Sequence, residues 1–210
     1  MLSLLEQALL TDACRSLPVR KSFEVTNNYV LNMLSMALDF QLRQRTVDAA
    51  FAHFKQNHRY RSHRRLRDLA ESFDNTKKGN LGLARTLWNN KLWTRAQFLR
   101  LLLKRFEERG VRGFASLSKW VERAEFDSDV RGQFKTKHHS MGYTMFQYLR
   151  LKLGHDTVKP DSRVICFVSE SIHRKASPKE CVEGIETAGK ILQRSARELD
   201  AAIYSREVTK

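Results

Sequence analysis

The stretch from Lys135 to Val168 holds the residues of this chain that are best placed to do chemistry. A polar turn containing glycine, His138-His139-Ser140-Met141-Gly142, enters an amphipathic helix, and such a turn exposes backbone N–H groups that can hold a phosphate. Further along, Pro160 fixes the backbone immediately before Asp161, which is well placed to start another helix. A carboxylate at a helix start is held in one orientation, and neighbouring cations keep it ionised. This segment therefore predicts a phosphate-binding turn followed by an oriented carboxylate.

This arrangement resembles the helix-hairpin-helix DNA glycosylase superfamily, whose members excise damaged or mismatched bases. In that family a turn of the type Pro-Gly-apolar-Gly is followed in the chain by the catalytic aspartate, which opens the next helix. Here His139-Ser140-Met141-Gly142 occupies the turn, and Asp161 follows Gly142 by nineteen residues. Asp161-Ser162-Arg163-Val164 is similar to the family's aspartate-led helix start. Leu38-Asp39-Phe40-Gln41 is similar to an early helix of some members, and Leu199–Tyr204 is similar to the last helix.

The departures from the family pattern narrow the activity that the resemblance implies. Ser140 replaces the first glycine of the turn, so the tight hairpin is altered. Thr144 stands where bifunctional members keep a catalytic lysine, which argues against Schiff-base chemistry and strand cleavage. The cysteines that hold an iron–sulfur cluster in one branch are missing, because Cys14, Cys166 and Cys181 are widely spaced. The expectation is a monofunctional hydrolase without a metal or other cofactor.

The chemistry implied by the resemblance is hydrolysis of an N-glycosidic bond in duplex DNA. The sugar acquires oxocarbenium character as this bond breaks, and a carboxylate stabilises that charge and orients or deprotonates water. Asp161 is the candidate for that carboxylate. The target nucleotide must be extruded from the duplex, and Gln41 is the candidate side chain for filling the gap. The aromatic residues that either stack on the flipped base or simply pack in the core are Trp88, Trp93, Trp120, Tyr143 and Phe146.

Alternatives remain open at the same residues. Pro-Asp-Ser is an ordinary helix start, so Asp161 is either catalytic or only a capping residue. Asp156 is the alternative aspartate. A chain that keeps the fold for phosphate docking alone would be a non-catalytic DNA-binding or RNA-binding helical protein. The residues expected to contact double-stranded DNA are Gln41, Lys135, Lys137, His139, Ser140, Met141, Gly142, Tyr143, Thr144 and Arg163.

The charge balance points to a polyanionic partner. The chain of 210 residues carries a formal charge of +15, and nucleic acid is the commonest polyanion inside cells. A run of cations from Lys55 to Arg67 either neutralises several phosphates or forms a solvated helix face. His53, His58 and His63 recur every five residues, a spacing that does not bring three zinc ligands to one helical face.

Helical periodicity dominates the rest of the chain. Apolar residues follow steps of three and four from about Asn28 to Phe54, from Phe98 to a cap at Gly110, and from Leu192 to Ile203. Only Val164–Val168 could suggest a strand, and it is short. The pattern predicts an all-α fold, with loops that include 76–82, 110–113, 127–132 and 154–160.

The resemblance, not the periodicity, implies a domain arrangement. It implies two helical lobes with a cleft between them: a central bundle over residues 30–158, with the hairpin at 138–142, and a terminal lobe formed by 1–29 and 159–210. The N-terminus lacks the apolar run of a secretory signal, and no segment approaches membrane-spanning length. We expect a cytoplasmic protein without a membrane partner.

Overall fold

The computed structural model describes residues 1–38, 42–58 and 62–206, which form eleven α-helices and one π-helix. Among these residues there is no strand, only an isolated antiparallel bridge between Lys135 and Ser140. The prediction of an all-α fold is confirmed. The helices are α1 (Leu4–Arg15), α2 (Tyr29–Leu38), α3 (Gln44–Asn57), α4 (His63–Glu71), α5 (Lys77–Trp88), α6 (Trp93–Glu108), α7 (Phe114–Arg123), η1 (Phe126–Val130), α8 (Tyr143–Lys152), α9 (Ser162–Ser171), α10 (Pro178–Leu192) and α11 (Ala196–Arg206).

The chain divides into two compact units. One unit is Thr26–Gly142, and the other combines Met1–Val25 with the residues from Tyr143 onward. These boundaries differ from the predicted ones, 30–158 and 1–29 with 159–210, because α8 belongs to the terminal unit. Helix α8 contacts α10, and Tyr143 packs against the core formed by the terminal helices.

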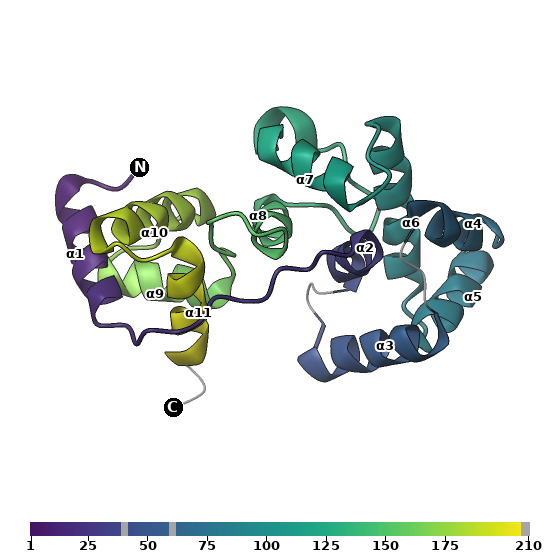
Figure 1. The fold of residues 1–210 in the computed structure, drawn as a ribbon, viewed down its shortest axis with the longest axis horizontal. Coiled ribbons are helices and arrows are strands. Elements are labelled where there is room, and N and C mark those ends of the chain that lie inside the picture. Colours follow the sequence, from purple (N-terminus) through teal and green to yellow (C-terminus); the bar gives the residue numbers. More distant parts are fainter. Residues whose placement is uncertain (39–41, 59–61, 207–210) are drawn as a thin grey trace. The chain divides into compact units, whose positions relative to one another are not determined.

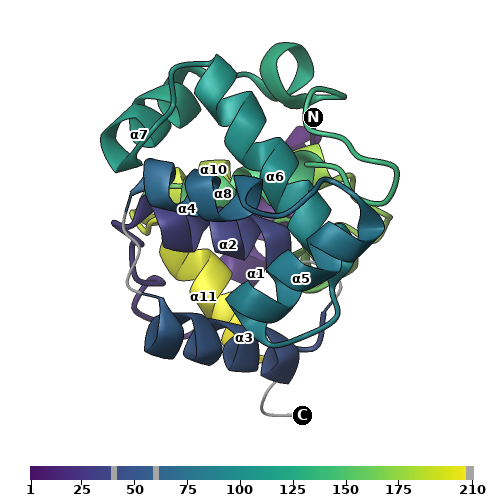
Figure 2. The same cartoon turned by 90° about the vertical axis from the view of Figure 1, so that its right-hand side faces the viewer.

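Helix α2 belongs to the Thr26–Gly142 unit, where it packs against α6 and α4 (Figure 2). Nine of its ten residues are buried. Its sequence, Tyr29-Val30-Leu31-Asn32-Met33-Leu34-Ser35-Met36-Ala37-Leu38, is apolar on almost every side, which is the pattern of a helix enclosed by others. The surrounding helices therefore need only one apolar face each.

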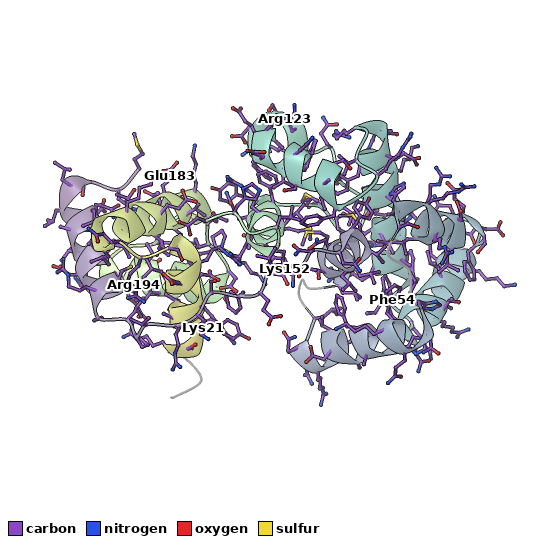
Figure 3. All side chains as sticks on the ribbon, in the orientation of Figure 1. Lys21, Phe54, Arg123, Lys152, Glu183 and Arg194 are labelled. Carbon is purple, nitrogen blue, oxygen red and sulfur yellow. The ribbon has the colours of Figure 1, made fainter. Side chains whose placement is uncertain are left out.

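The terminal unit joins the two ends of the sequence. Helix α1 lies beside α10, and α9 and α11 complete the group (Figure 1). Gly184 on α10 permits this close approach, since a Cβ there would lie 2.8 Å from a methyl carbon of Leu10. Arg194, labelled in Figure 3, donates hydrogen bonds to the carbonyls of Cys14, Leu17 and Pro18, so it fixes the end of α1.

The apolar segment from about Asn28 to Phe54 contains two helices, since α2 ends at Leu38 and Arg43 has an extended backbone before α3. Two predicted loops are corrected. Residues 127–132, expected as a loop, are mostly the π-helix η1. Residues 76–82, expected as a loop, are mostly the first turns of α5. Their glycines serve close packing instead, since a Cβ on Gly79 would clash with the carbonyl of Asp74 at 2.0 Å and one on Gly82 would lie 2.9 Å from the ring of Phe73.

The predicted helix ends at Gly110 and Gly154 are confirmed. Gly110 has φ +73°, and the next amide, that of Val111, bonds back to the carbonyl of Phe106 at 2.8 Å, as in a Schellman cap. Gly154 has φ +95° and follows α8. The stretch Val164–Val168 lies within α9 and forms no strand.

Candidate functional site

The candidate site is built on the three residues Lys159-Pro160-Asp161, which lead into α9. Every backbone N–H and C=O group of this segment forms a hydrogen bond. The Lys159 amide donates to Asp200 Oδ1 at 3.0 Å, and the Asp161 amide donates to the Lys159 carbonyl at 2.7 Å. The Pro160 carbonyl accepts from the hydroxyl of Thr144 at 3.1 Å, and the Asp161 carbonyl accepts from the first turn of α9. Buried backbone groups are satisfied in this way in stable structures, so the segment has a fixed conformation.

Asp161 is the N-cap of α9, as predicted. One of its oxygens, Oδ1, accepts from the amides of Arg163 at 3.0 Å and Val164 at 3.3 Å. The other oxygen, Oδ2, accepts no hydrogen bond from the residues that the structure describes. The cap therefore fixes the orientation of the carboxylate through one oxygen and leaves the second oxygen for another partner.

A second carboxyl group lies close to Asp161. Asp200, on the inward face of α11, is only 5% exposed, and its Oδ1 accepts the Lys159 amide. Burial, together with the charge of Asp161, raises the pKa of Asp200 to about 7, although the Lys159 amide and ammonium oppose that rise. Asp200 therefore keeps its proton to a much higher pH than an ordinary aspartate does.

Lys159 and Arg163, which flank Asp161 in the sequence, each place a positive charge over a tyrosine ring. The ammonium of Lys159 lies 4.3 Å from the ring centre of Tyr148, and that of Lys152, labelled on α8 in Figure 3, lies 5.8 Å from the same ring. The guanidinium of Arg163 lies 4.0 Å from the ring centre of Tyr204, which is 42% exposed. These contacts keep the positive charges near the start of α9.

The predicted turn lies at the end of the other unit, in a segment without helix. Residues 131–142 separate η1 from α8, and the Lys135–Ser140 bridge closes the turn. The Met141 amide also donates to the Phe134 carbonyl at 2.9 Å. A helix-hairpin-helix joins two helices by a short turn, and this turn departs from that form because a long non-helical segment enters it. Lys135, Lys137, Ser140 and Gly142 are exposed on it.

Three of the residues expected to contact DNA are instead buried or make contacts within the protein. Met141 is buried, since it is only 2% exposed. Burial, with the charge of Arg95, lowers the pKa of His139 to about 4, and its Nε2 lies 2.9 Å from the hydroxyl of Thr94, so the ring is neutral at pH 7. Tyr143 packs against the core of the terminal unit, where burial raises its pKa.

The hydroxyl of Thr144 holds the Pro160 carbonyl, and Arg163 lies over Tyr204. Gln41 lies outside the described residues. Asp156 is exposed and accepts the backbone amide of Arg197, so its described contact is with the start of α11.

The candidate stacking aromatics divide by burial. Trp88 and Phe146 are each 2% exposed and belong to the hydrophobic core. Trp120 packs edge-on against Phe106. Trp93 is only partly buried and lies 5.1 Å, ring centre to ring centre, from His138 beside the predicted turn.

In the basic run from Lys55 to Arg67, Arg67 is bonded to another helix of its own unit, whereas Arg64 pairs with Asp68 on the same helix and Arg59 and Arg61 lie outside the described residues. Arg67 pairs with Glu107 at 2.6 Å, and Glu107 also lies 3.5 Å from Arg112 and 3.6 Å from His63 Nε2. His53 and His58 both approach the carbonyl of Thr86 on α5. An open pocket of about 370 Å³ here is lined by Ser62, His63, Arg64, Arg67, Glu107 and Arg112.

Sequence reasoning missed Asp200 and the two tyrosines beside the cations. The signal for Asp200 is an acid between apolar neighbours, Leu199-Asp200-Ala201-Ala202-Ile203, on a helix whose inward face is apolar. No comparable signal marks Tyr148 or Tyr204, because their cation contacts depend on how α8 and α11 pack.

Among the described residues, no cluster of three histidine, cysteine or acidic side chains could hold a metal ion. Within the same residues, no helix combines the length and the apolar character needed to cross a membrane.

Comparisons with curated proteins and with solved structures gave no match. A family defined as a domain of unknown function, DUF8548, matches residues 33–207. Because this match covers most of the chain, including Asp161 and Asp200, the protein belongs to the DUF8548 family.

Proposed function

We propose that this protein is a monofunctional DNA glycosylase in which Asp161 is the catalytic carboxylate. The observation that carries the proposal is the asymmetric bonding of Asp161. One oxygen is anchored by two amides of α9, and the other accepts no bond from the described residues. An oriented carboxylate with one available oxygen is suited to stabilising a cationic sugar.

The proposed reaction breaks the bond between the sugar C1′ and the base nitrogen. The base leaves with the bonding electron pair and is protonated, while a water oxygen bonds to C1′. Asp161 stabilises the positive charge that develops on the sugar, and then takes the proton that the attacking water loses. Below pH 7 Asp200 largely keeps its proton, so it adds no full negative charge beside Asp161.

Duplex DNA is the proposed partner. Lys135 and Lys137 are exposed on the segment that contains the predicted turn. Lys159 and Arg163 flank Asp161 in the sequence at the start of α9. Cations on such elements contact phosphates without reading sequence. Thr144, where a Schiff-base lysine would stand, has its hydroxyl on the Pro160 carbonyl, which supports hydrolysis without strand cleavage.

The test is excision from a panel of duplexes, each carrying one modified or mismatched base, followed by alkaline cleavage of abasic sites. Asp161→Asn should abolish excision while preserving the fold, since the amide oxygen can still accept the cap bonds. Asp156→Asn is the matched control, because Asp156 is exposed and also accepts a backbone amide, that of Arg197 at the start of α11. Excision by Asp161→Asn at the wild-type rate would disprove the mechanism.

A second candidate is a DNA-binding protein without catalysis. The two cap bonds of Asp161 favour it, because they account for that carboxylate by helix stability alone. Salt-sensitive duplex binding with no abasic product on any substrate supports this candidate over the glycosylase. A strong preference for structured RNA in competition would count against both.

A further inference from the structure

We infer that Asp200 is a positioning residue which, together with Thr144, holds the Lys159–Asp161 segment so that the Asp161 carboxylate keeps one orientation. This inference rests on the proposed function for its catalytic consequence, but its structural part does not. The two holding groups come from different helices, α11 and α8, and reach successive residues of the segment.

The geometry makes the two contacts complementary. Asp200 Oδ1 fixes the amide end of Lys159, and the Thr144 hydroxyl fixes the carbonyl of Pro160. Pro160 has no amide to donate, so these contacts and the bond from the Asp161 amide to the Lys159 carbonyl complete the segment. Without Asp200, the Lys159 amide loses its partner and the segment can rotate about Lys159.

The burial of Asp200 sets its charge state. The charged groups that act on it are Lys159 and Asp161. A neutral Asp200 accepts the Lys159 amide without repelling Asp161, whereas an ionised Asp200 places a second negative charge beside it. The pKa of Asp200, raised by burial to about 7, puts this change in the physiological range.

The experiment compares Asp200→Leu, which removes the acceptor, with Asp200→Asn, which keeps an acceptor oxygen but cannot ionise. Amide hydrogen exchange at Lys159 and Asp161 in the free protein measures the holding contact, and single-turnover excision measures its effect on chemistry. Asp200→Leu should speed exchange at Lys159 and slow excision, each by about tenfold, with duplex affinity nearly unchanged. Asp200→Asn should restore both values.

The pH profile separates positioning from general stability. Wild-type excision should fall as the pH rises through about 7, because Asp200 then ionises beside Asp161. Asp200→Asn should show no such fall, and a fall of the same size in that variant would overturn the charge argument.

The remaining outcomes are distinguishable. Unchanged exchange at Lys159 in Asp200→Leu overturns the inference. If exchange at Lys159 is faster in Asp200→Leu but the wild-type protein excises no base, the holding contact is supported and the glycosylase proposal is refuted. Unchanged excision by Asp200→Leu, in a protein that does excise bases, overturns the catalytic consequence. If Asp200→Leu does not fold, Thr144→Val and its conservative partner Thr144→Ser test the contact at the Pro160 carbonyl, with exchange measured at the Asp161 amide.

Discussion

The hydroxyl of Thr144 donates a hydrogen bond of 3.1 Å to the carbonyl oxygen of Pro160. Thr144 is two residues past Gly142, the last residue of the predicted phosphate-binding turn, and Pro160 directly precedes Asp161. The first turn of α8 and the start of α9 are therefore joined by one side chain.

Thr144→Val should lower the free energy of unfolding by about 1 kcal/mol, because the partly buried carbonyl of Pro160 loses its donor. Thr144→Ser keeps the hydroxyl and should lie within about 0.5 kcal/mol of the wild type. Urea denaturation of the three proteins measures this difference. Equal losses in both variants would mean that the methyl group, not the hydrogen bond, matters.

Asp200→Asn should remove a specific pH dependence of stability. The pKa of Asp200 rises from 3.8 in the unfolded chain to about 7 in the fold, so the folded state binds the proton more tightly. The contribution of Asp200 to the free energy of unfolding is therefore greatest at low pH. It is lost as the pH rises from about 4 to about 7, and the loss is at most about 4 kcal/mol. Urea midpoints of both proteins across pH 5–8 measure the difference, and parallel curves would contradict the assignment.

Arg174→Met should make the protein more sensitive to acid and less stable at neutral pH. Arg174 bonds to Glu6 on α1 and Glu180 on α10, and these bonds lower the pKa of each carboxyl to about 2. A lowered carboxyl pKa gives stability that is present above about 4.5 and is lost as the pH falls toward 2. Acid unfolding followed by circular dichroism measures the midpoint, which should move to higher pH. Lys175→Met, at the exposed neighbouring position, is the control and should leave the midpoint unchanged.

Lys137→Gln should weaken duplex binding and reduce the salt dependence of affinity. Each phosphate contact contributes about 0.9 to the slope of log affinity against log salt, so this slope should fall by about that amount. His139→Gln should leave the slope unchanged at pH 7, because the pKa of His139, about 4, leaves the ring neutral. Fluorescence anisotropy titrations at several salt concentrations compare the two variants. A reduced slope for His139→Gln would contradict the expectation that the His139 ring is neutral at pH 7.

Gly154→Ala should cost about 1–2 kcal/mol of stability, whereas Gly142→Ala should cost little. Gly154 has φ +95°, which disfavours any side chain, and an added Cβ would lie 3.2 Å from a methyl carbon of Val25. Gly142 lacks a positive φ, and no atom lies within 4 Å of an added Cβ. Thermal unfolding of both variants tests this contrast. A large loss for Gly142→Ala would show that the turn needs glycine after all.

The sequence by itself determined the helical class, the helix ends at Gly110 and Gly154, and the capping position of Asp161. These features depend on residues close together in the chain: a 3.6-residue apolar repeat, a glycine at positive φ, and an aspartate before two free amides. The tertiary structure alone decided that Met141 is buried, that His139 is neutral, and that α8 belongs with the terminal helices. It also brought Asp200 to the Lys159 amide across 41 residues of sequence. Such contacts depend on how distant helices pack, and a local pattern of residue types does not contain that information.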